Sequence, residues 1–197
     1  MAFKTFTSAV LTASEVNDYL MKQANIVCTS ATRPTAVEGM RIYETDTDRE
    51  LVYDGSNWII QSEPATTWTP TWTNVTVGNG THSSWYHRSD GYVDFHASLT
   101  FGSTSAVTGS IQLTLPINAV TGVTTINAYG VFYDSSAANS YPVLFAPAST
   151  TTLTLNASTA SGTYTNVTVT SSTIPFTWAT GDIISVSGRY RMTTRAS

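Results

Sequence analysis

The sequence is poor in charge. Only 11% of its 197 residues are charged, against ~25% in an ordinary soluble domain. The apolar fraction is ordinary at 41%, so Thr, Ser, Asn and Gly occupy the places of the missing charged residues. Thr is β-branched and fits a pleated strand, and the other three suit turns. This composition predicts an all-β protein with neutral faces.

The charge that is present is unevenly distributed. Between Thr100 and Ser197 the charged residues are Asp134, Asp182, Arg189, Arg191 and Arg195. The net charge of -4 argues against a nucleic-acid partner, because phosphate binding needs clustered Lys and Arg.

Cysteine and long apolar runs are also scarce. Cys28 is the single cysteine, so no intrachain disulfide forms, and we expect a small buried hydrophobe rather than a nucleophile. No apolar run approaches the ~18 residues of a membrane span. Met1 to Val10 lacks the apolar core of a secretory signal. We therefore expect no membrane insertion and, if the protein reaches the outside of a cell, release by a route such as lysis.

Residues 1–32 are predicted to hold a short helix. Thr12 and Glu15 have the spacing of a capping box, and Leu11 can pack on Val16. Val16, Tyr19 and Leu20 follow at helical spacing. A helix of about 13 residues is marginal alone, so it either docks on its own chain or anchors the chain to a partner. Under the second alternative, Leu11, Val16, Tyr19 and Leu20 form the attachment surface.

Residues 33–62 are predicted to form a three-stranded meander. Its strands are expected at Met40–Glu44, Glu50–Tyr53 and Trp58–Gln61, and Asp54-Gly55 is a strong hairpin signal. So small a unit has too little core to stand alone. Residues 63–67 are predicted to form a linker.

Residues 68–197 are predicted to form a β-sandwich, jelly-roll-like, because short strands alternate with turn signals. The expected strands are Thr71–Val77, Tyr92–Phe101, Ile111–Leu115, Thr124–Tyr133, Val143–Ala146, Thr151–Leu155, Tyr164–Thr170 and Ile183–Met192. Turns are expected at Asp90-Gly91 and at other Gly-containing positions.

Several segments of the sequence resemble segments of actinobacterial phage tail and fibre proteins. They are Phe6–Met21, Arg33-Pro34, Glu38–Arg49 and Tyr53–Trp58. Trp68-Thr69-Pro70, Gly78–Thr81, Leu99–Thr104, Leu113–Pro116, Phe176–Asp182 and Ser187–Tyr190 resemble the β-sandwich head of such fibres. The resemblance implies a structural virion protein that is not an enzyme, a homotrimer, and an N-terminal segment that contacts other virion proteins.

Three roles remain open for such a protein. The head could bind a host-surface glycan, decorate the head or neck of the particle without a receptor role, or act as a polysaccharide depolymerase. A receptor binder shows saturable sugar binding without product, an enzyme releases oligosaccharide, and a decoration protein does neither.

Two polar clusters contain the residue types that bind metal ions. His82, His87 and His96 lie near Asp90 and Asp94, but their spacing matches no structural zinc pattern. Glu44, Asp46, Asp48 and Glu50 alternate like the start of a calcium loop. That loop's glycine and terminal glutamate are missing. We expect polar decoration of a hairpin and an exposed turn, and no metal or cofactor.

The aromatic residues near turns and strand ends are candidates for sugar contact. They are Trp85, Tyr86, Tyr92, Tyr129, Tyr133 and Tyr141, with Asn127, Asp134, Asn139 and Ser140 as candidate polar partners. Trp85 follows a turn, and Tyr133 and Tyr141 flank the loop from Asp134 to Ser140, so these three are the predicted glycan contacts. The alternative is that half of these rings pack in the core.

Overall fold

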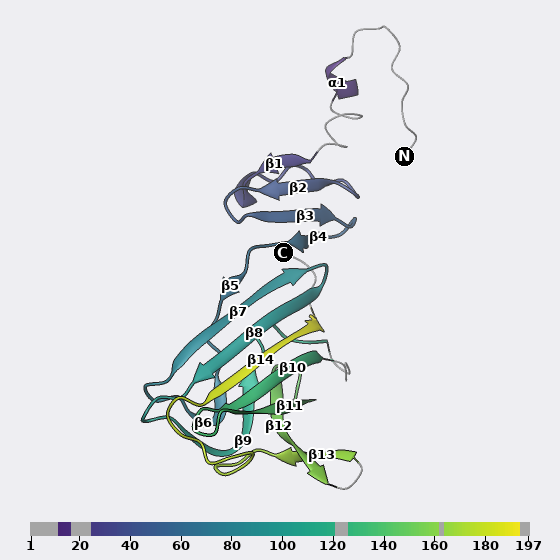
Figure 1. Cartoon of the computed structure of the whole chain (residues 1–197). Coiled ribbons are helices and arrows are strands. Elements are labelled where there is room, and N and C mark those ends of the chain that lie inside the picture. The colour runs from purple at the N-terminus through teal and green to yellow at the C-terminus, as the bar shows by residue number, and fades with distance from the viewer. Residues whose placement is uncertain (1–11, 17–24, 121–125, 162–163, 194–197) are drawn as a thin grey trace. The chain divides into compact units, whose positions relative to one another are not determined.

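The computed structural model of the chain describes residues 12–16, 25–120, 126–161 and 164–193. They divide between two compact units. The small unit contains the described residues up to Pro64 together with residues 88–91, and the large unit contains those from 65–87 and 92–193. Both units are built from β-strands (Figure 1), which confirms the prediction of an all-β protein.

Only one turn of the predicted N-terminal helix lies in the described residues. It is α1 (Ala13–Glu15), followed by a hydrogen bond of 3.0 Å from the Val16 N–H to the Thr12 carbonyl. Leu11, Tyr19 and Leu20 lie outside the described residues, and Val16 is half-buried. The full predicted helix is therefore not seen. Among the described residues, no helix is long and apolar enough to cross a membrane.

The small unit is a four-stranded sheet in the order β1-β2-β3-β4. The antiparallel strands β2 (Arg41–Glu44), β3 (Arg49–Tyr53) and β4 (Trp58–Ser62) match the predicted meander. The strand β1 (Ile26–Cys28), which was not predicted, pairs in parallel with β2 and is followed by the 3₁₀ turn η3 (Ser30–Thr32).

The core of the small unit is a compact apolar cluster. It contains Met40, Ile42, Leu51 and Ile60, with Ile26, Cys28, Val37 and Trp58 packed against it. Burial is the largest cause of the raised pKa of the Cys28 thiol. The fourth strand therefore supplies apolar cover that a three-stranded meander lacks.

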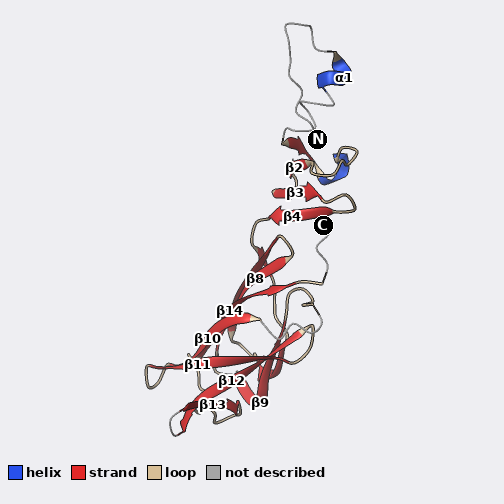
Figure 2. Ribbon diagram, turned by 90° about the vertical axis from the view of Figure 1, so that its right-hand side faces the viewer, coloured by secondary structure: helices blue, strands red, loops and turns tan. Residues whose placement is uncertain are grey.

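The large unit is one curled sheet, and most of its strands are eight to ten residues long (Figure 2). Its strands are β5 (Thr66–Thr67), β6 (Trp72–Thr76), β7 (Thr81–Ser89), β8 (Tyr92–Thr100), β9 (Ala106–Thr114), β10 (Asn127–Asp134), β11 (Asn139–Pro147), β12 (Thr152–Ser161), β13 (Tyr164–Val169) and β14 (Ile183–Arg191). The spatial order is β5-β7-β8-β14-β10-β11-β12-β9-β6, and β13 pairs with β12. Residues 88–91, at the turn between β7 and β8, belong to the small unit.

Strand β11 lets the sheet curl. Residues 139–142 of β11 pair with β10, and residues 143–147 pair with β12. Pro142 stands where the pairing changes, and proline is tolerated there because it has no N–H to donate to a ladder.

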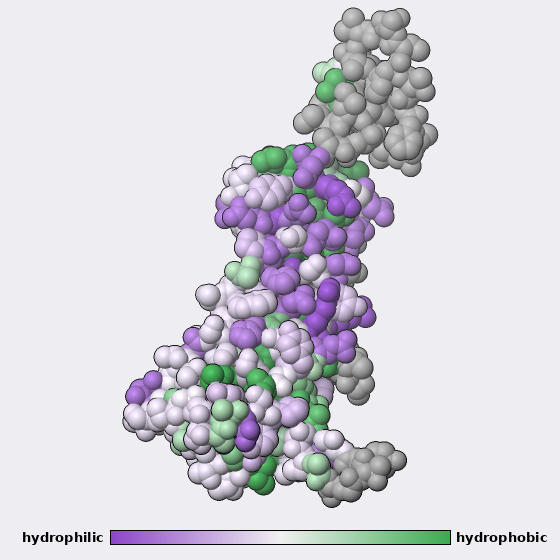
Figure 3. Space-filling model, viewed as in Figure 1, coloured by the Kyte–Doolittle hydropathy of each residue, from purple (hydrophilic) through white to green (hydrophobic). Residues whose placement is uncertain are grey.

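A single apolar cluster fills the inside of the curl. It draws on both halves of the sheet and includes Val93, Phe95, Ala97, Leu99, Ile111, Leu113, Phe132, Leu153, Leu155, Ile184, Val186 and Tyr190. The face of this unit seen in Figure 3 is mostly pale, the colour of intermediate hydropathy. Residues of intermediate hydropathy, the class that includes Thr and Ser, therefore make up most of the surface of this unit in that view.

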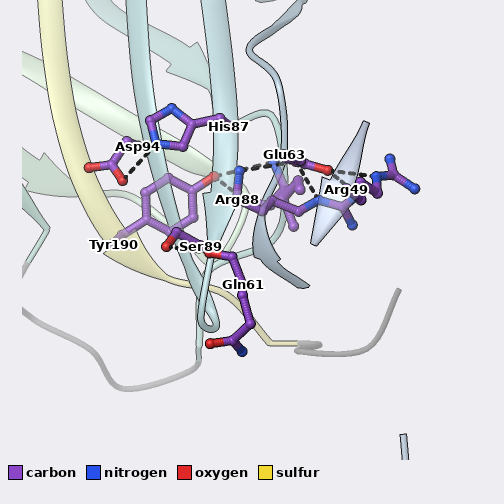
Figure 4. Close-up of polar contacts among 9 residues, drawn as sticks. Arg49, Gln61, Glu63, His87, Arg88, Ser89, Asp94 and Tyr190 are labelled. Carbon is purple, nitrogen blue, oxygen red and sulfur yellow. Dashed lines mark hydrogen bonds and ion pairs between the residues drawn. The ribbon is translucent and has the colours of Figure 1, made fainter. Parts of the chain in front are cut away.

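Glu63 is a buried polar centre within the small unit (Figure 4). Its carboxylate is 3% exposed. It accepts hydrogen bonds from the Arg88 backbone N–H (3.0 Å), Arg88 Nε (2.8 Å), Arg88 Nη2 (2.8 Å) and Arg49 Nε (3.0 Å). Burial alone would raise the pKa of Glu63, but the hydrogen bonds and charges of Arg88 and Arg49 outweigh it and hold the pKa below its ordinary value of 4.5. The predicted linker therefore begins with a buried carboxylate and includes β5.

Replacing Glu63 with Gln is expected to destabilise the small unit by about 2 kcal/mol, because two guanidinium groups then lose a buried charged partner. The stabilisation by Glu63 is present above pH 4.5, its ordinary pKa, and is lost as the pH falls through the lower folded pKa. Hydrogen exchange of the β3 and β4 amides measures both effects. Glu50→Gln, at an exposed position of β3, is the matched control. Equal protection in the two variants would contradict this account.

Candidate functional site

Outward-facing side chains of neighbouring strands in the large unit form the candidate site. In β8, burial alternates residue by residue, so Tyr92, Asp94 and His96 face outward while the residues between them are buried. This is the two-residue period of a strand with one face on the core. The same alternation in β14 leaves Ser187 and Arg189 on the outer face.

Antiparallel pairing arranges these side chains in two rows. Asp94 is paired with Arg189, which is paired with Asn127 of β10; we call these three residues the polar row. His96 is paired with Ser187, which is paired with Tyr129. Together with Trp85 of β7, which stacks on His96, these residues form the aromatic row.

The aromatic row has a ring at each end. The Trp85 side chain stacks on the imidazoles of His96 and His87, with ring centroids 6.0 Å and 6.1 Å apart. Trp85 is 39% exposed and Tyr129 is 75% exposed. His96 Nδ1 lies 2.9 Å from Ser187 Oγ, and burial lowers the pKa of His96 below 6.5. His96 is therefore mainly neutral at pH 7, and the middle of the row carries no charge.

The polar row contains one carboxylate and one guanidinium. Asp94 Oδ2 lies 3.5 Å from His87 Nε2 (Figure 4) and 3.9 Å from Arg189 Nε. The Arg189 guanidinium also lies over the Tyr92 ring, 4.8 Å from its centroid. The side chains of Asp94 and Arg189 are 28% and 51% exposed, so both remain accessible to a ligand.

A groove of about 460 Å³ runs between the two exposed rings. Its lining includes Trp85 and Tyr129, the polar row, and the central residues Phe95, Gly188 and Ala128. A Cβ at Gly188 would lie 2.8 Å from Ala128 Cβ and 2.9 Å from Asn127 O, so glycine permits the close strand pairing at this point. The volume falls within the ~300–1,000 Å³ of small-molecule sites.

The turn before β8 positions Trp85 and His87. Asp90 and Gly91 both have positive φ, +45° and +81°. This is the combination that a two-residue type I′ hairpin requires and that Asp-Gly supplies. The predicted turn is therefore confirmed, and it joins β7 to β8 so that Trp85 and His87 lie beside His96 and Asp94.

The other two predicted glycan contacts lie away from the groove lining. Tyr133 is outward-facing on β10, paired with Ser140 and Ile183. Tyr141 pairs with the buried Phe132, packs against the core and lies 5.3 Å from the Phe176 ring centroid. The structure thus brings Trp85 together with Tyr129 and Asn127, and not with Tyr133 or Tyr141. Sequence reasoning did not select Arg189, since its pairing with Asp94 arises only from the sheet.

The three histidines do not gather at one point. His87 and His96 flank Trp85, but His82 Nδ1 accepts a hydrogen bond from Trp72 Nε1 (3.4 Å). Burial lowers the pKa of His82. Among the described residues, no group of three or more His, Cys, Asp or Glu side chains could hold a metal ion.

The acidic residues around the first turn of the meander have separate partners. Glu44 is paired with Arg33 and accepts a hydrogen bond from Thr47. Asp46 accepts hydrogen bonds from Ser30, which lower its pKa, and Asp48 accepts one from the Tyr43 hydroxyl. These carboxylates therefore organise a turn rather than converge on a cation.

No protein-family model, curated protein or solved structure matches this chain.

Proposed function

We propose that this chain is a structural protein of a bacteriophage virion, a fibre or minor tail component that is not an enzyme and whose large unit binds a bacterial surface glycan. The observation that supports glycan binding is the groove between Trp85 and Tyr129. Aromatic faces stack on the C–H faces of sugar rings, and the polar row supplies groups that hydrogen-bond to hydroxyls. The segments between Phe6 and Trp58 that resemble phage tail and fibre proteins support the virion assignment.

We also propose that the curled sheet is a jelly-roll-like β-sandwich that forms the outward head of the particle component. Two features support this finer description. The core cluster takes residues from both halves of the sheet, and β11 passes from one half to the other. Two sheet layers that share one core are the basis of a sandwich.

The acids of the large unit favour binding over cleavage. Glycosidic hydrolysis ordinarily uses two carboxyl groups, and the acids of residues 65–87 and 92–193 are Asp94, Asp134 and Asp182. Asp134 accepts hydrogen bonds from the turn residues Ser136 and Ala137. Asp182 is buried and accepts hydrogen bonds from Ser135 and Ala179. Asp94 is the carboxylate that remains for the groove, which supports an adhesion role over a depolymerase.

The same proposal assigns attachment to the N-terminal segment and a trimeric state to the protein. Leu11, Val16, Tyr19 and Leu20 are the proposed contacts with other virion proteins. The small core of the first unit supports association with further copies, as does Val27, which is 66% exposed on the edge strand β1. Among the described residues, no strand pairs with the outer edge of β1, and an apolar residue at such an edge favours contact with another chain.

The full-length protein at micromolar concentration is expected to sediment as a trimer, at three times the chain mass of 21.2 kDa. Self-association should bury the outer edge of β1 and extend the small core. Sedimentation velocity over a range of concentrations measures the mass. A single species at the mass of one chain throughout that range would contradict the trimer.

Particles carrying Trp85→Ala or Tyr129→Ala are expected to adsorb to host cells at least about tenfold more slowly, because many weak sites act together on one particle. Tyr129 is 75% exposed, so its removal should leave the fold intact. Tyr133→Ala, on the same strand but outside the groove, is the matched control, and thermal melting checks all three variants. Unchanged adsorption of stable Trp85 and Tyr129 variants would favour a head or neck decoration role instead.

A further inference from the structure

We propose that the groove selects a neutral, hydroxyl-rich oligosaccharide over an anionic one, and that Asp94 sets this selectivity. This inference rests on the proposed glycan-binding function and names the ligand class of the same groove.

The first step concerns charge. Asp94 Oδ2 lies 3.9 Å from Arg189 Nε, so a ligand group that reaches the guanidinium also meets the carboxylate. An anion gains attraction from Arg189 and suffers repulsion from Asp94 over similar distances, and the two contributions largely cancel. Arg191, the next outward residue along β14, is paired with Tyr92 and lies outside the groove lining. The polar row therefore provides no net attraction for an anion.

The second step concerns hydrogen bonding. A carboxylate only accepts, a guanidinium only donates, and the Asn127 amide does both. A sugar hydroxyl donates and accepts, so two adjacent hydroxyls can bind Asp94 and Arg189 at the same time. A ligand carboxylate or phosphate only accepts, and it would leave Asp94 opposite an acceptor with no proton between them. That mismatch costs binding free energy in a partly desolvated site.

The third step concerns length. Trp85 and Tyr129 lie on β7 and β10, which are separated in the sheet by β8 and β14. Three strand spacings amount to roughly 14 Å, which is wider than one pyranose ring. A ligand that contacts both rings therefore contains more than one sugar unit, and its middle lies over Ser187 and Gly188 of the groove lining.

The test uses the full-length protein and a matched ligand pair. The α-1,4-linked galactotriose has the same linkage as trigalacturonic acid and differs from it in the C6 groups, and neutral trisaccharides of glucose and mannose extend the panel. Ligand-detected NMR titration measures each affinity. We expect at least one neutral trisaccharide to bind, more tightly than its monosaccharide, and trigalacturonic acid to bind about tenfold more weakly than that trisaccharide.

Asp94→Asn keeps the shape of the side chain and removes its charge. It should weaken neutral trisaccharide binding about tenfold and should narrow or reverse the preference over trigalacturonic acid. Arg191→Gln, which changes a charge on the same strand outside the groove, should alter neither property.

The outcomes separate the two levels of the proposal. If no sugar binds, or if binding persists unchanged in Trp85→Ala, the glycan-binding function itself is overturned. If binding depends on Trp85 but trigalacturonic acid binds as tightly as the neutral sugars, or Asp94→Asn leaves the preference unchanged, the function stands and the inference about ligand class fails.

Discussion

Antiparallel pairing of β8, β14 and β10 is the constraint on which the candidate site depends. Pairing of Asp94 with Arg189 and of Arg189 with Asn127 creates the polar row, and the next outward position creates the aromatic row. A slip of one residue would turn these side chains toward the core and expose the buried positions. The apolar core and the Asp90-Gly91 turn thus fix the register, and the register creates the groove.

The ionic groups of the two units have distinct tasks, and they are scarce in the large unit. Glu63, Asp134 and Asp182 each accept several hydrogen bonds that organise a turn or a strand connection. Asp94 and Arg189 instead lie on an open sheet face, where their pairing does little for stability. Without clustered charge, long-range steering is weak, and recognition depends on short-range contacts with aromatic faces and hydrogen-bonding groups.

Regular alternation and Asp-Gly turns explain which parts of the fold could be predicted from sequence. The meander strands and β8 and β14 alternate clearly between apolar and polar positions, and both Asp-Gly turns were recognisable. Strand β7 was missed because its inward positions are polar, so apolar and polar residues do not alternate along it. These positions are His82, Ser84 and Tyr86. Strand β1 has only three residues and pairs with a strand distant in sequence.

The site was only partly predictable because the pairing of the strands decides which side chains face outward. Tyr133 and Tyr141 flank the same loop, yet the β10–β11 pairing turns Tyr133 outward and sets Tyr141 opposite the buried Phe132. Tyr129 and Asn127 were in the candidate set, and their two-residue spacing gave them a shared face. The strand neighbours that join them to Trp85 are remote in sequence, so composition and spacing could not select them.

The central claim is that the outer face of β7, β8, β14 and β10 binds the ligand, and indole NMR tests it directly. The five tryptophans give five indole N–H signals in the full-length protein. The indole N–H groups of Trp72 and Trp178 donate hydrogen bonds to His82 and Ser171, whereas Trp85 lines the groove. On titration with host surface polysaccharide, the account predicts a saturable shift that is largest at Trp85, with Trp72 and Trp178 unmoved. Saturable binding that leaves the Trp85 signal unchanged would contradict it.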